Sequence, residues 1–457
     1  MCSIFSEKKQ AHWRLEVSTK LENGIFASLD IGTTSIKVIV AEIVNGQTNI
    51  IGVGHEKSRG LSRGIIVDID QTVISIKNAV KQAEEKANVA IDEVIVGIPA
   101  YGLEIEPGHG MVKVAGDESE ITDEDVQNVL AAAMVKAVPP ERELLTVLPE
   151  EFVVDGFDGI RDPRGMVGVR LEMHALLLTV PKTIMHNIRR CVRNAGLIMR
   201  DVVVQPLAIG SIALTDGERD FGVVLVDMGG GQTTASAIHD NQLKFTHVDQ
   251  EGGEYITKDI SIVLNTTVDN AEKLKRNHGY ATVNAASAEK NMLVEVVGQN
   301  EPVSISEEYL TEIIEARLVQ IFEIIKEELD RIRALELPGG VVLTGGTSAL
   351  PAIKELAEEI FGVQTKVYIP DYMGVRYPTF STAIGLIQYI AGQDEIQRLI
   401  NDFINGYENE PASAPVAEGN RPQQMEYRDQ YVDEDHSPET KVSFWEKIKA
   451  FFASFFE

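Results

Sequence analysis

Apolar positions along the chain follow two different periods. Between Ile25 and about Ile400, short runs of β-branched and aliphatic residues alternate with longer stretches in which apolar residues recur every three or four positions. The clearest strand-like runs are Ile36–Val40, Val94–Ile98, Val223–Val226 and Val341–Thr344, and the clearest helical stretches are Thr72–Ala87, Asp123–Val135 and Glu307–Ile332. This alternation predicts an α/β fold. Ser304 and Glu307 have the spacing of a capping box, so we expect the last of these helices to begin there.

The pattern changes sharply after about residue 405. Residues 406–440 contain nine acidic residues, two arginines and four prolines, with almost no apolar side chains to bury. Such a segment cannot offset the entropy lost on ordering, so we predict a disordered linker.

Hydrophobic residues return in Lys441–Glu457. On a helical projection, seven of them fall within about 140° of arc: Phe444, Trp445, Ile448, Phe451, Phe452, Phe455 and Phe456. Such a helix could pack on the protein's own core, but a simple packing helix would not need the preceding tether. We therefore predict an amphipathic helix that lies on a membrane surface.

Charge limits the class of partner. The 457 residues contain 42 Lys and Arg against 70 Asp and Glu, a formal net charge of −28. A nucleic-acid binder needs a basic face, so we expect no nucleic-acid partner. Broad adhesion to anionic lipid is disfavoured as well, and any membrane contact should be local and mainly hydrophobic.

Length and composition indicate a multidomain protein of the cytosol. The length predicts two to four domains. No apolar run approaches the roughly 18 residues of a membrane span. The first residues lack the apolar stretch of a signal peptide, and the two cysteines, Cys2 and Cys191, are far apart, as expected in a reducing compartment.

A motif occurs twice, about two hundred residues apart. Each copy is an apolar strand ending in an aspartate, a Gly/Thr turn and a second β-type run. Glycines let backbone N–H groups approach an anion, and Thr hydroxyls add donors. One such turn alone is more often an ordinary hairpin, but two facing turns could bind the phosphates of a nucleotide, with Asp30 and Asp227 near Mg²⁺. The residues predicted to bind are Asp30, Gly32, Thr33 and Thr34 in the first copy and Asp227, Gly229, Gly230, Gly231 and Thr233 in the second.

Two further segments complete a possible nucleotide site. The strand Val341–Thr344 runs into Gly345 and Gly346, which leave a flat surface for an adenosine. Glu272 and Lys275 lie three residues apart on a predicted helix, suited to bind a ribose or simply to form a solvated pair.

In this order, the hairpins, the Glu/Lys helix and the Gly-Gly turn resemble the ATPase fold shared by actin, seventy-kilodalton heat-shock chaperones and sugar kinases. Within it, residues 26–390 and the terminal helix resemble the FtsA family of bacterial cell-division proteins. The segments Val203–Gly210 and Ser381–Gly385 resemble the two connecting helices, where Ala208 and Gly385 permit close approach. The resemblance implies an actin-like α/β fold, two halves around a nucleotide cleft, that binds ATP and Mg²⁺.

The resemblance also implies a division of the chain. We expect an N-terminal extension (1–24), the first half (25–102 and 200–219) with an inserted subdomain (103–199), the second half (220–252 and 336–377) with a partner-binding subdomain (253–335), a closing connecting helix (378–405), the linker (406–440) and the membrane helix (441–457).

The implied partners are the C-terminal peptide of FtsZ, the inner leaflet of the cytoplasmic membrane at the division site, other copies of the chain in filaments, and other division proteins. Arg317 is a candidate for binding FtsZ. Its helical neighbours include no carboxylate, so its stem either covers the core or its guanidinium awaits a partner's carboxylate.

No catalytic base can be identified, so the sequence leaves open whether ATP is hydrolysed at more than a low rate. Two alternatives also remain at this point. One is a docking protein of pilus assembly that is similar to FtsA, and the other is a kinase or chaperone on the same fold.

Overall fold

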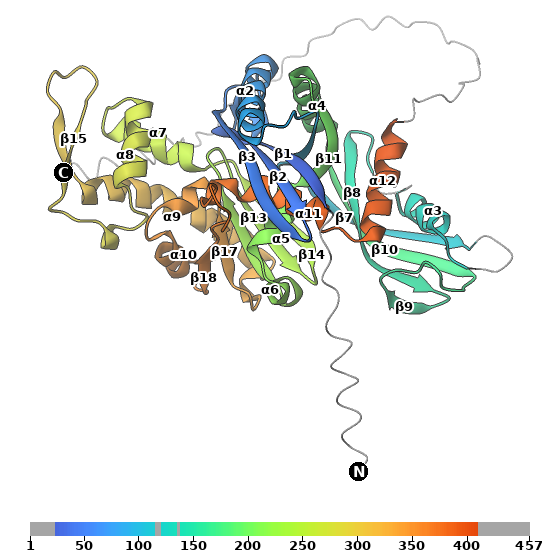
Figure 1. Ribbon diagram of the computed structural model, residues 1–457. Helices are drawn as coiled ribbons and strands as arrows, with labels where there is room; N and C mark the ends of the chain where they lie inside the picture. Colours follow the sequence, from blue (N-terminus) through green and yellow to red (C-terminus); the bar gives the residue numbers. More distant parts are fainter. Residues whose placement is uncertain (1–22, 115–119, 135–137, 410–457) are drawn as a thin grey trace, which may run out of the picture. The chain divides into compact units, whose positions relative to one another are not determined.

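The computed structural model describes residues 23–114, 120–134 and 138–409 (Figure 1). The predicted membrane helix and all but the first four residues of the predicted linker lie outside these ranges. Within these ranges, no helix is both long enough and apolar enough to cross a bilayer.

The first half is built on a five-stranded sheet of order β11-β6-β1-β2-β3 (Figure 1). Three antiparallel strands are followed by two parallel ones, because β6 pairs in parallel with both β1 and β11. The strands are β1 (Gly24–Ile31), β2 (Ser35–Val44), β3 (Gln47–Lys57), β6 (Glu93–Ile98) and β11 (Ile198–Val204), with a small hairpin of β4 (Leu61–Ser62) and β5 (Ile65–Ile66) after β3.

Helices α2 (Ile69–Ala87) and α4 (Lys182–Ala195) pack against each other beside this sheet. Helix α2 begins earlier than predicted because Asp68 caps it, accepting a hydrogen bond from the Gln71 amide at 3.0 Å. Met185 and Ile188 of α4 lie in the same core as Leu29 and Val38 of the sheet. Helix α4 therefore belongs to the first half by packing, although the predicted insertion extends to residue 199.

The second half repeats this plan in a sheet of order β14-β13-β12-β17-β18. Again an antiparallel meander is followed by two parallel strands. The repeated sequence motif thus reflects a repeated fold. The strands are β12 (Val223–Met228), β13 (Thr233–His239), β14 (Gln242–Asp249), β17 (Val341–Thr344) and β18 (Thr365–Val367).

Two helices cross between the two halves. Helix α5 (Gln205–Ala213) leads from the first sheet towards the short α6 (Asp216–Phe221), and α11 (Ser381–Ala391) packs against α5. A Cβ atom on Gly385 would lie 2.2 Å from the carbonyl oxygen of Ala208, so only glycine fits at this crossing. The small residues predicted to permit close approach do lie at the crossing.

An inserted unit carries its own sheet and core. Its four strands, in the order β7-β10-β8-β9, are all antiparallel. They are β7 (Glu104–Lys113), β8 (Arg142–Val154), β9 (Phe157–Ile160) and β10 (Arg170–Pro181), and α3 (Asp123–Met134) packs on β7 and β10.

The range 378–405, predicted to be one closing helix, contains two. Helix α11 ends at Gly392, and α12 (Glu395–Asn409) begins after Asp394, whose carboxylate accepts a hydrogen bond from the Gln397 amide at 2.7 Å. Helix α12 then buries Ile396 and Ile400 in the core of the inserted unit. The single-helix prediction was wrong because a glycine stop and an aspartate cap divide the range.

The remaining elements surround the second sheet. They are α7 (Gly253–Val263), α8 (Val268–His278), the hairpin of β15 (Asn291–Val294) and β16 (Val303–Ser306), α9 (Glu307–Arg331) and α10 (Ile353–Phe361), with short 3-10 turns at η1 (Val283–Ala285), η2 (Ala334–Glu336), η3 (Gly346–Ala349) and η4 (Pro378–Phe380). The predicted cap of α9 was wrong by two residues: Ser304 pairs within β16, and Ser306 accepts the hydrogen bond of the Tyr309 amide at 3.1 Å.

Candidate functional site

The first hairpin places a carboxylate at its tip. Asp30 lies near the end of β1, opposite Lys37 of β2, and both residues are buried. The Lys37 ammonium lies 3.0 Å from Asp30 Oδ2, and Gln205 donates a hydrogen bond to Asp30 Oδ1 at 3.2 Å. The carboxylate is therefore held rigidly between the hairpin and the first connecting helix. Gly32, Thr33 and Thr34 form the turn.

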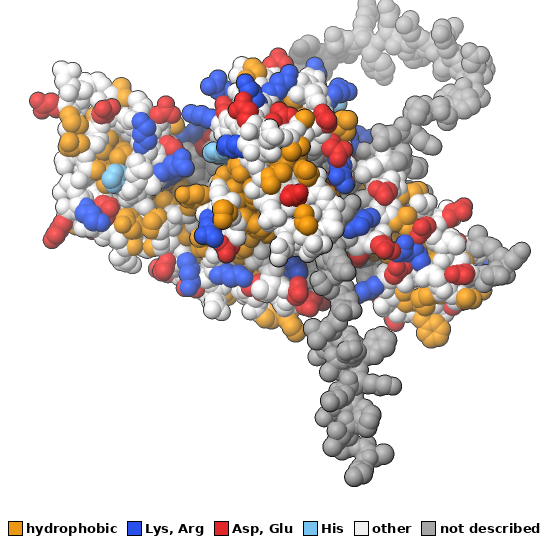
Figure 2. All heavy atoms as spheres, viewed as in Figure 1, with side chains coloured by type: hydrophobic (Ala, Val, Ile, Leu, Met, Phe, Trp, Pro, Cys, Tyr) orange, Lys and Arg blue, Asp and Glu red, His pale blue; other side chains and the backbone are white. Residues whose placement is uncertain are grey.

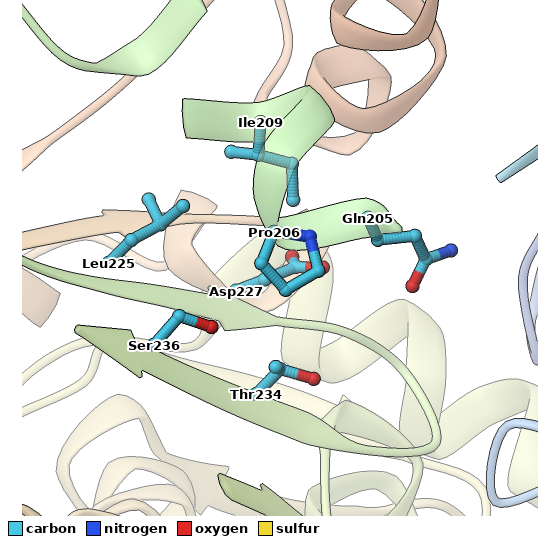
Figure 3. A pocket seen from close by; sticks show the side chains of 7 residues that line it. All are labelled: Gln205, Pro206, Ile209, Leu225, Asp227, Thr234 and Ser236. Atoms are coloured by element: carbon cyan, nitrogen blue, oxygen red, sulfur yellow. The ribbon is translucent and has the colours of Figure 1, made fainter. Parts of the chain in front are cut away.

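The second hairpin places Asp227 in the equivalent position, near the end of β12 and opposite Thr234. Its side chain lines a narrow crevice beneath α5, too tight to admit a water molecule (Figure 3). The lining combines three apolar and four polar residues: Pro206, Ile209, Leu225, Gln205, Asp227, Thr234 and Ser236. Removal from water, reinforced by the Asp30 carboxylate and opposed by Lys37, raises the pKa of Asp227 to about 6.

The two turns contact each other directly. A Cβ atom on Gly231 would lie 2.4 Å from Thr33 Oγ1, and one on Gly230 would lie 2.2 Å from Thr34 Cγ2. Thr33 Oγ1 also accepts a hydrogen bond from the Gly64 amide at 2.9 Å. Turns that are about two hundred residues apart in the sequence thus form one site.

The Gly-Gly turn joins the same site. Gly345 has a φ of +89°, and a Cβ atom there would lie 2.3 Å from Asp227 Oδ1. Gly346 begins η3, and the next residue, Thr347, donates a hydrogen bond to the Gly229 carbonyl at 2.9 Å. The backbone after β17 is therefore packed against the second hairpin.

Glu272 and Lys275, on α8, form an ion pair of 2.7 Å rather than a loose solvated pair. The Lys275 ammonium also donates to the Gly253 carbonyl at 2.8 Å and to Thr257 at 2.7 Å. Burial lowers the pKa of Lys275, and the adjacent Glu272 opposes that shift. Gly253 in turn donates its amide to the Gly229 carbonyl at 3.0 Å, which links this pair to the second turn.

The side chains present suit a hydrated divalent cation with a phosphate ligand. Among the described residues, no group of three or more His, Cys, Asp or Glu side chains is arranged to hold a metal. The charge of Asp30, however, helps to raise the pKa of Asp227, so the two carboxylates repel each other. A cation between them would relieve that repulsion, and phosphates and waters would supply the remaining oxygen ligands.

Comparison with known proteins decides the family. The family model described as cell division protein FtsA matches residues 224–385, and that of the SHS2 domain inserted in FtsA matches residues 102–179. The cell division protein FtsA of Enterococcus hirae is 52% identical over 445 residues, covering 95% of this chain and all of that protein. The chain belongs to the FtsA family of cell division proteins.

Further relatives and a solved structure support the family and the fold. The FtsA protein of Bacillus subtilis strain 168 is 44% identical over 375 residues, covering 82% of this chain and 85% of that protein. The structure of a PilM–PilN type IV pilus biogenesis complex superposes with a TM-score of 0.56 at 16% identity, covering 82% of this chain and all of that chain. That likeness concerns the fold alone. Together with the doubled sheet, it confirms the predicted actin-like α/β fold, and family membership favours cell division over pilus assembly.

In this member of the FtsA family, Arg317 already has carboxylate partners. Its guanidinium binds Asp259 through Nε at 2.6 Å and Nη2 at 3.0 Å, and Glu251 through Nη1 at 2.8 Å. Burial lowers the pKa of Arg317, but the hydrogen bonds and charges of Asp259 and Glu251 outweigh burial and raise it. The helix around Arg317 supplies no carboxylate, as the sequence indicated, but Asp259 and Glu251 come from other elements and could not be foreseen from local spacing.

The remaining predicted residues also have defined places. Gly229 donates its amide to the Gln232 carbonyl at 3.0 Å within the second turn. The hydroxyl of the buried Thr233 donates to the Glu251 carbonyl at 2.9 Å, so that donor is already used inside the protein.

Sequence reasoning missed three residues of this site: Lys37, Gln205 and Thr347. The position of Lys37 could have been recognised, because a lysine within the apolar run Ile36–Val40 is expected to be buried and therefore to need an anionic partner. Gln205 and Thr347 gave no comparable signal, because their contacts with Asp30 and Gly229 depend on the packing of distant segments.

Proposed function

We propose that the chain is an ATP-binding, actin-like adaptor that holds FtsZ at the cytoplasmic membrane during division. The observation that carries the proposal is the direct contact between two acid-tipped turns, one from each half, with Gly345 packed against Asp227. Backbone amides and hydroxyls from both halves converge there with one buried lysine, which is the chemistry that a polyphosphate requires.

In this proposal the triphosphate lies between the turns and Mg²⁺ neutralises part of its charge. Asp30 and Asp227 hold waters of the hydrated cation, and Lys37 offsets the phosphate charge. Glu272 and Lys275 bind the ribose, and the backbone of Gly345 and Gly346 supports the adenine. Thr34 and Thr33 lie directly against Gly230 and Gly231, so a phosphate bound between the two turns has to part them.

Because the two turns belong to different halves, separating them on ATP binding would change how the two halves are positioned relative to each other. A ligand that contacts both turns favours the arrangement in which both contacts form. We propose that this arrangement is the one that assembles into filaments. No residue of the site is assigned as a catalytic base, and hydrolysis forms no part of the proposal.

Membrane attachment is assigned to Lys441–Glu457, and FtsZ binding to the subdomain formed by α7, α8, α9 and the β15–β16 hairpin. The chain then acts at the cytoplasmic face of the membrane, at the division site, together with other division proteins. A filament that displays many weakly binding helices would attach firmly even though each one binds reversibly.

Co-sedimentation with phospholipid vesicles tests the adaptor role. The full chain should sediment with vesicles and carry a fluorescent FtsZ C-terminal peptide with it, more so with Mg-ATP. Phe451→Glu, on the apolar arc, should release the chain, because a charge enters the face that contacts lipid. Ala453→Glu adds the same charge on the opposite face and should leave binding nearly unchanged. Equal sedimentation of the two variants would refute the membrane assignment.

A further inference from the structure

Helix α4 has an unusual charge for this chain. It contains Lys182, Arg189, Arg190 and Arg193 and no acidic residue, whereas the chain as a whole has far more acids than bases. The neighbouring α2 adds three lysines and three acids, so the pair of helices has seven basic residues against three acidic ones. Figure 2 shows the Lys and Arg side chains over α2 interspersed with Asp and Glu, so the excess of basic residues comes from α4.

The basic side of α4 is fixed towards solvent by the packing of its other side. Met185, Ile188 and Cys191 are buried in the core of the first half, with exposed fractions of 4% or less. Lys182, Arg190 and Arg193 are exposed on the opposite side. A rigid helix therefore presents these charges together.

These three cations are available to an external partner. Arg189 differs from them, because it pairs with Glu143. For Lys182, Arg190 and Arg193, the described part of the chain supplies no carboxylate within 4 Å. Because the chain as a whole has a net charge of −28, this face, with no acidic residue on its helix, is favourable for a negative partner.

We infer that the basic face of α4, defined by Lys182, Arg190 and Arg193, contacts anionic lipid headgroups and orients the first half against the membrane. This inference rests on the proposed attachment through Lys441–Glu457. That segment has three lysines and two glutamates, so it supplies little attraction to anionic lipid. A chain of net charge −28 would be repelled from an anionic surface unless its basic face lay nearest.

Vesicle binding at two lipid compositions tests the inference. The full chain and the triple variant Lys182→Gln, Arg190→Gln, Arg193→Gln are compared on neutral phosphatidylcholine vesicles and on vesicles with 30% phosphatidylglycerol. A basic residue near an anionic bilayer contributes about fivefold to affinity. The triple variant should therefore lose about 10- to 100-fold in affinity on the anionic vesicles and almost nothing on the neutral ones.

A matched control removes the same charge elsewhere. The control variant carries Lys113→Gln, Lys354→Gln and Arg376→Gln, three exposed residues outside α2 and α4. Its affinity for anionic vesicles should stay within about twofold of the wild type, because charges far from the bilayer are screened by salt. Both triple variants should keep the wild-type thermal midpoint.

The outcomes separate the two proposals. Equal losses in both triple variants would mean that only net charge matters, and no loss in the α4 variant would mean that another face meets the lipid; either result overturns the inference. Deletion of Lys441–Glu457 should abolish binding to both vesicle types. Unchanged binding after that deletion would refute the membrane helix itself, whatever the α4 variant does. Selective loss in the α4 variant of an interaction with an acidic protein, with vesicle binding intact, would also overturn the lipid assignment.

Discussion

At the scale of single residues, the site combines two carboxyl groups that repel each other. Asp30 forms an ion pair with Lys37 and accepts a hydrogen bond from Gln205, whereas removal from water and the charge of Asp30 raise the pKa of Asp227. Asp227 therefore opposes folding when it is ionised, a cost that a cation would remove. Both acids could be predicted because the motif repeats in the sequence. The difference in their surroundings could not be predicted, because it depends on which side chains of α5 lie beside each carboxylate.

Replacement of Asp227 by Asn should stabilise the nucleotide-free protein at neutral pH. The pKa of Asp227 rises from 3.8 to about 6, so the native state binds more protons than the unfolded state between these values. The contribution of this group to stability is therefore greatest below about pH 4 and is lost as the pH rises through about 6. We expect Asp227→Asn to gain about 1–2 kcal/mol at pH 7.5, after allowance for the partial exposure of the side chain, and nothing at pH 4.

Thermal unfolding without nucleotide, followed across that pH range, measures the effect. Asp240→Asn, in the exposed turn between β13 and β14, removes the same charge and should leave the midpoint nearly unchanged. A lower midpoint for Asp227→Asn at pH 7.5 would show that the carboxylate is favourably paired and would contradict this electrostatic description.

Arg317 is predicted to act in stability rather than as a free contact for a partner. Arg317→Ala leaves Asp259 and Glu251 without their cation in a partly buried site, so we expect a loss of about 2–3 kcal/mol. Arg331→Ala, on the exposed surface of the same helix, should change stability by less than about 0.5 kcal/mol. Chemical denaturation of both variants makes the comparison. A stable Arg317→Ala protein that no longer binds the FtsZ peptide would restore the partner-contact interpretation.

At the scale of elements, the strands and the long helices follow from local pattern. The run Val341–Thr344 is β17, and Asp123–Val135 is α3 to within one residue. The prediction failed at element ends, where one side chain decides: Asp68 extends α2, Ser306 rather than Ser304 caps α9, and Gly392 with Asp394 separates α11 from α12. The packing of α12 on the inserted unit had no local signal, because contacts between distant segments determine it.

The crossing of α5 and α11 gives a test at this scale. Gly385→Ala places a Cβ atom against the Ala208 carbonyl and has to force the two helices apart, so we expect a loss of about 1–3 kcal/mol and weaker nucleotide binding. Gly217→Ala, in the exposed α6, meets nothing within 4 Å and should be neutral or slightly stabilising. Comparison of the two thermal midpoints checks this. Equal midpoints would mean that the crossing is loose enough to accept a methyl group.

At the scale of the molecule, one α/β plan is used twice, and the two copies meet at their acid-tipped turns. The described structure thereby places the residues of the candidate site on the two sides of one contact. The sequence predicted both halves and the meeting of the turns. It did not predict that the turns touch through Gly230 and Gly231 against Thr34 and Thr33, because that contact depends on how the two halves pack together.

Calorimetric titration of Mg-ATP into the wild type, Asp227→Asn and Asp240→Asn tests the central claim most directly. A carboxylate that holds the hydrated cation should contribute about 10- to 100-fold to affinity, so Asp227→Asn should weaken binding by that factor while Asp240→Asn binds like the wild type. Equal affinities for all three proteins would contradict a nucleotide site between the two turns.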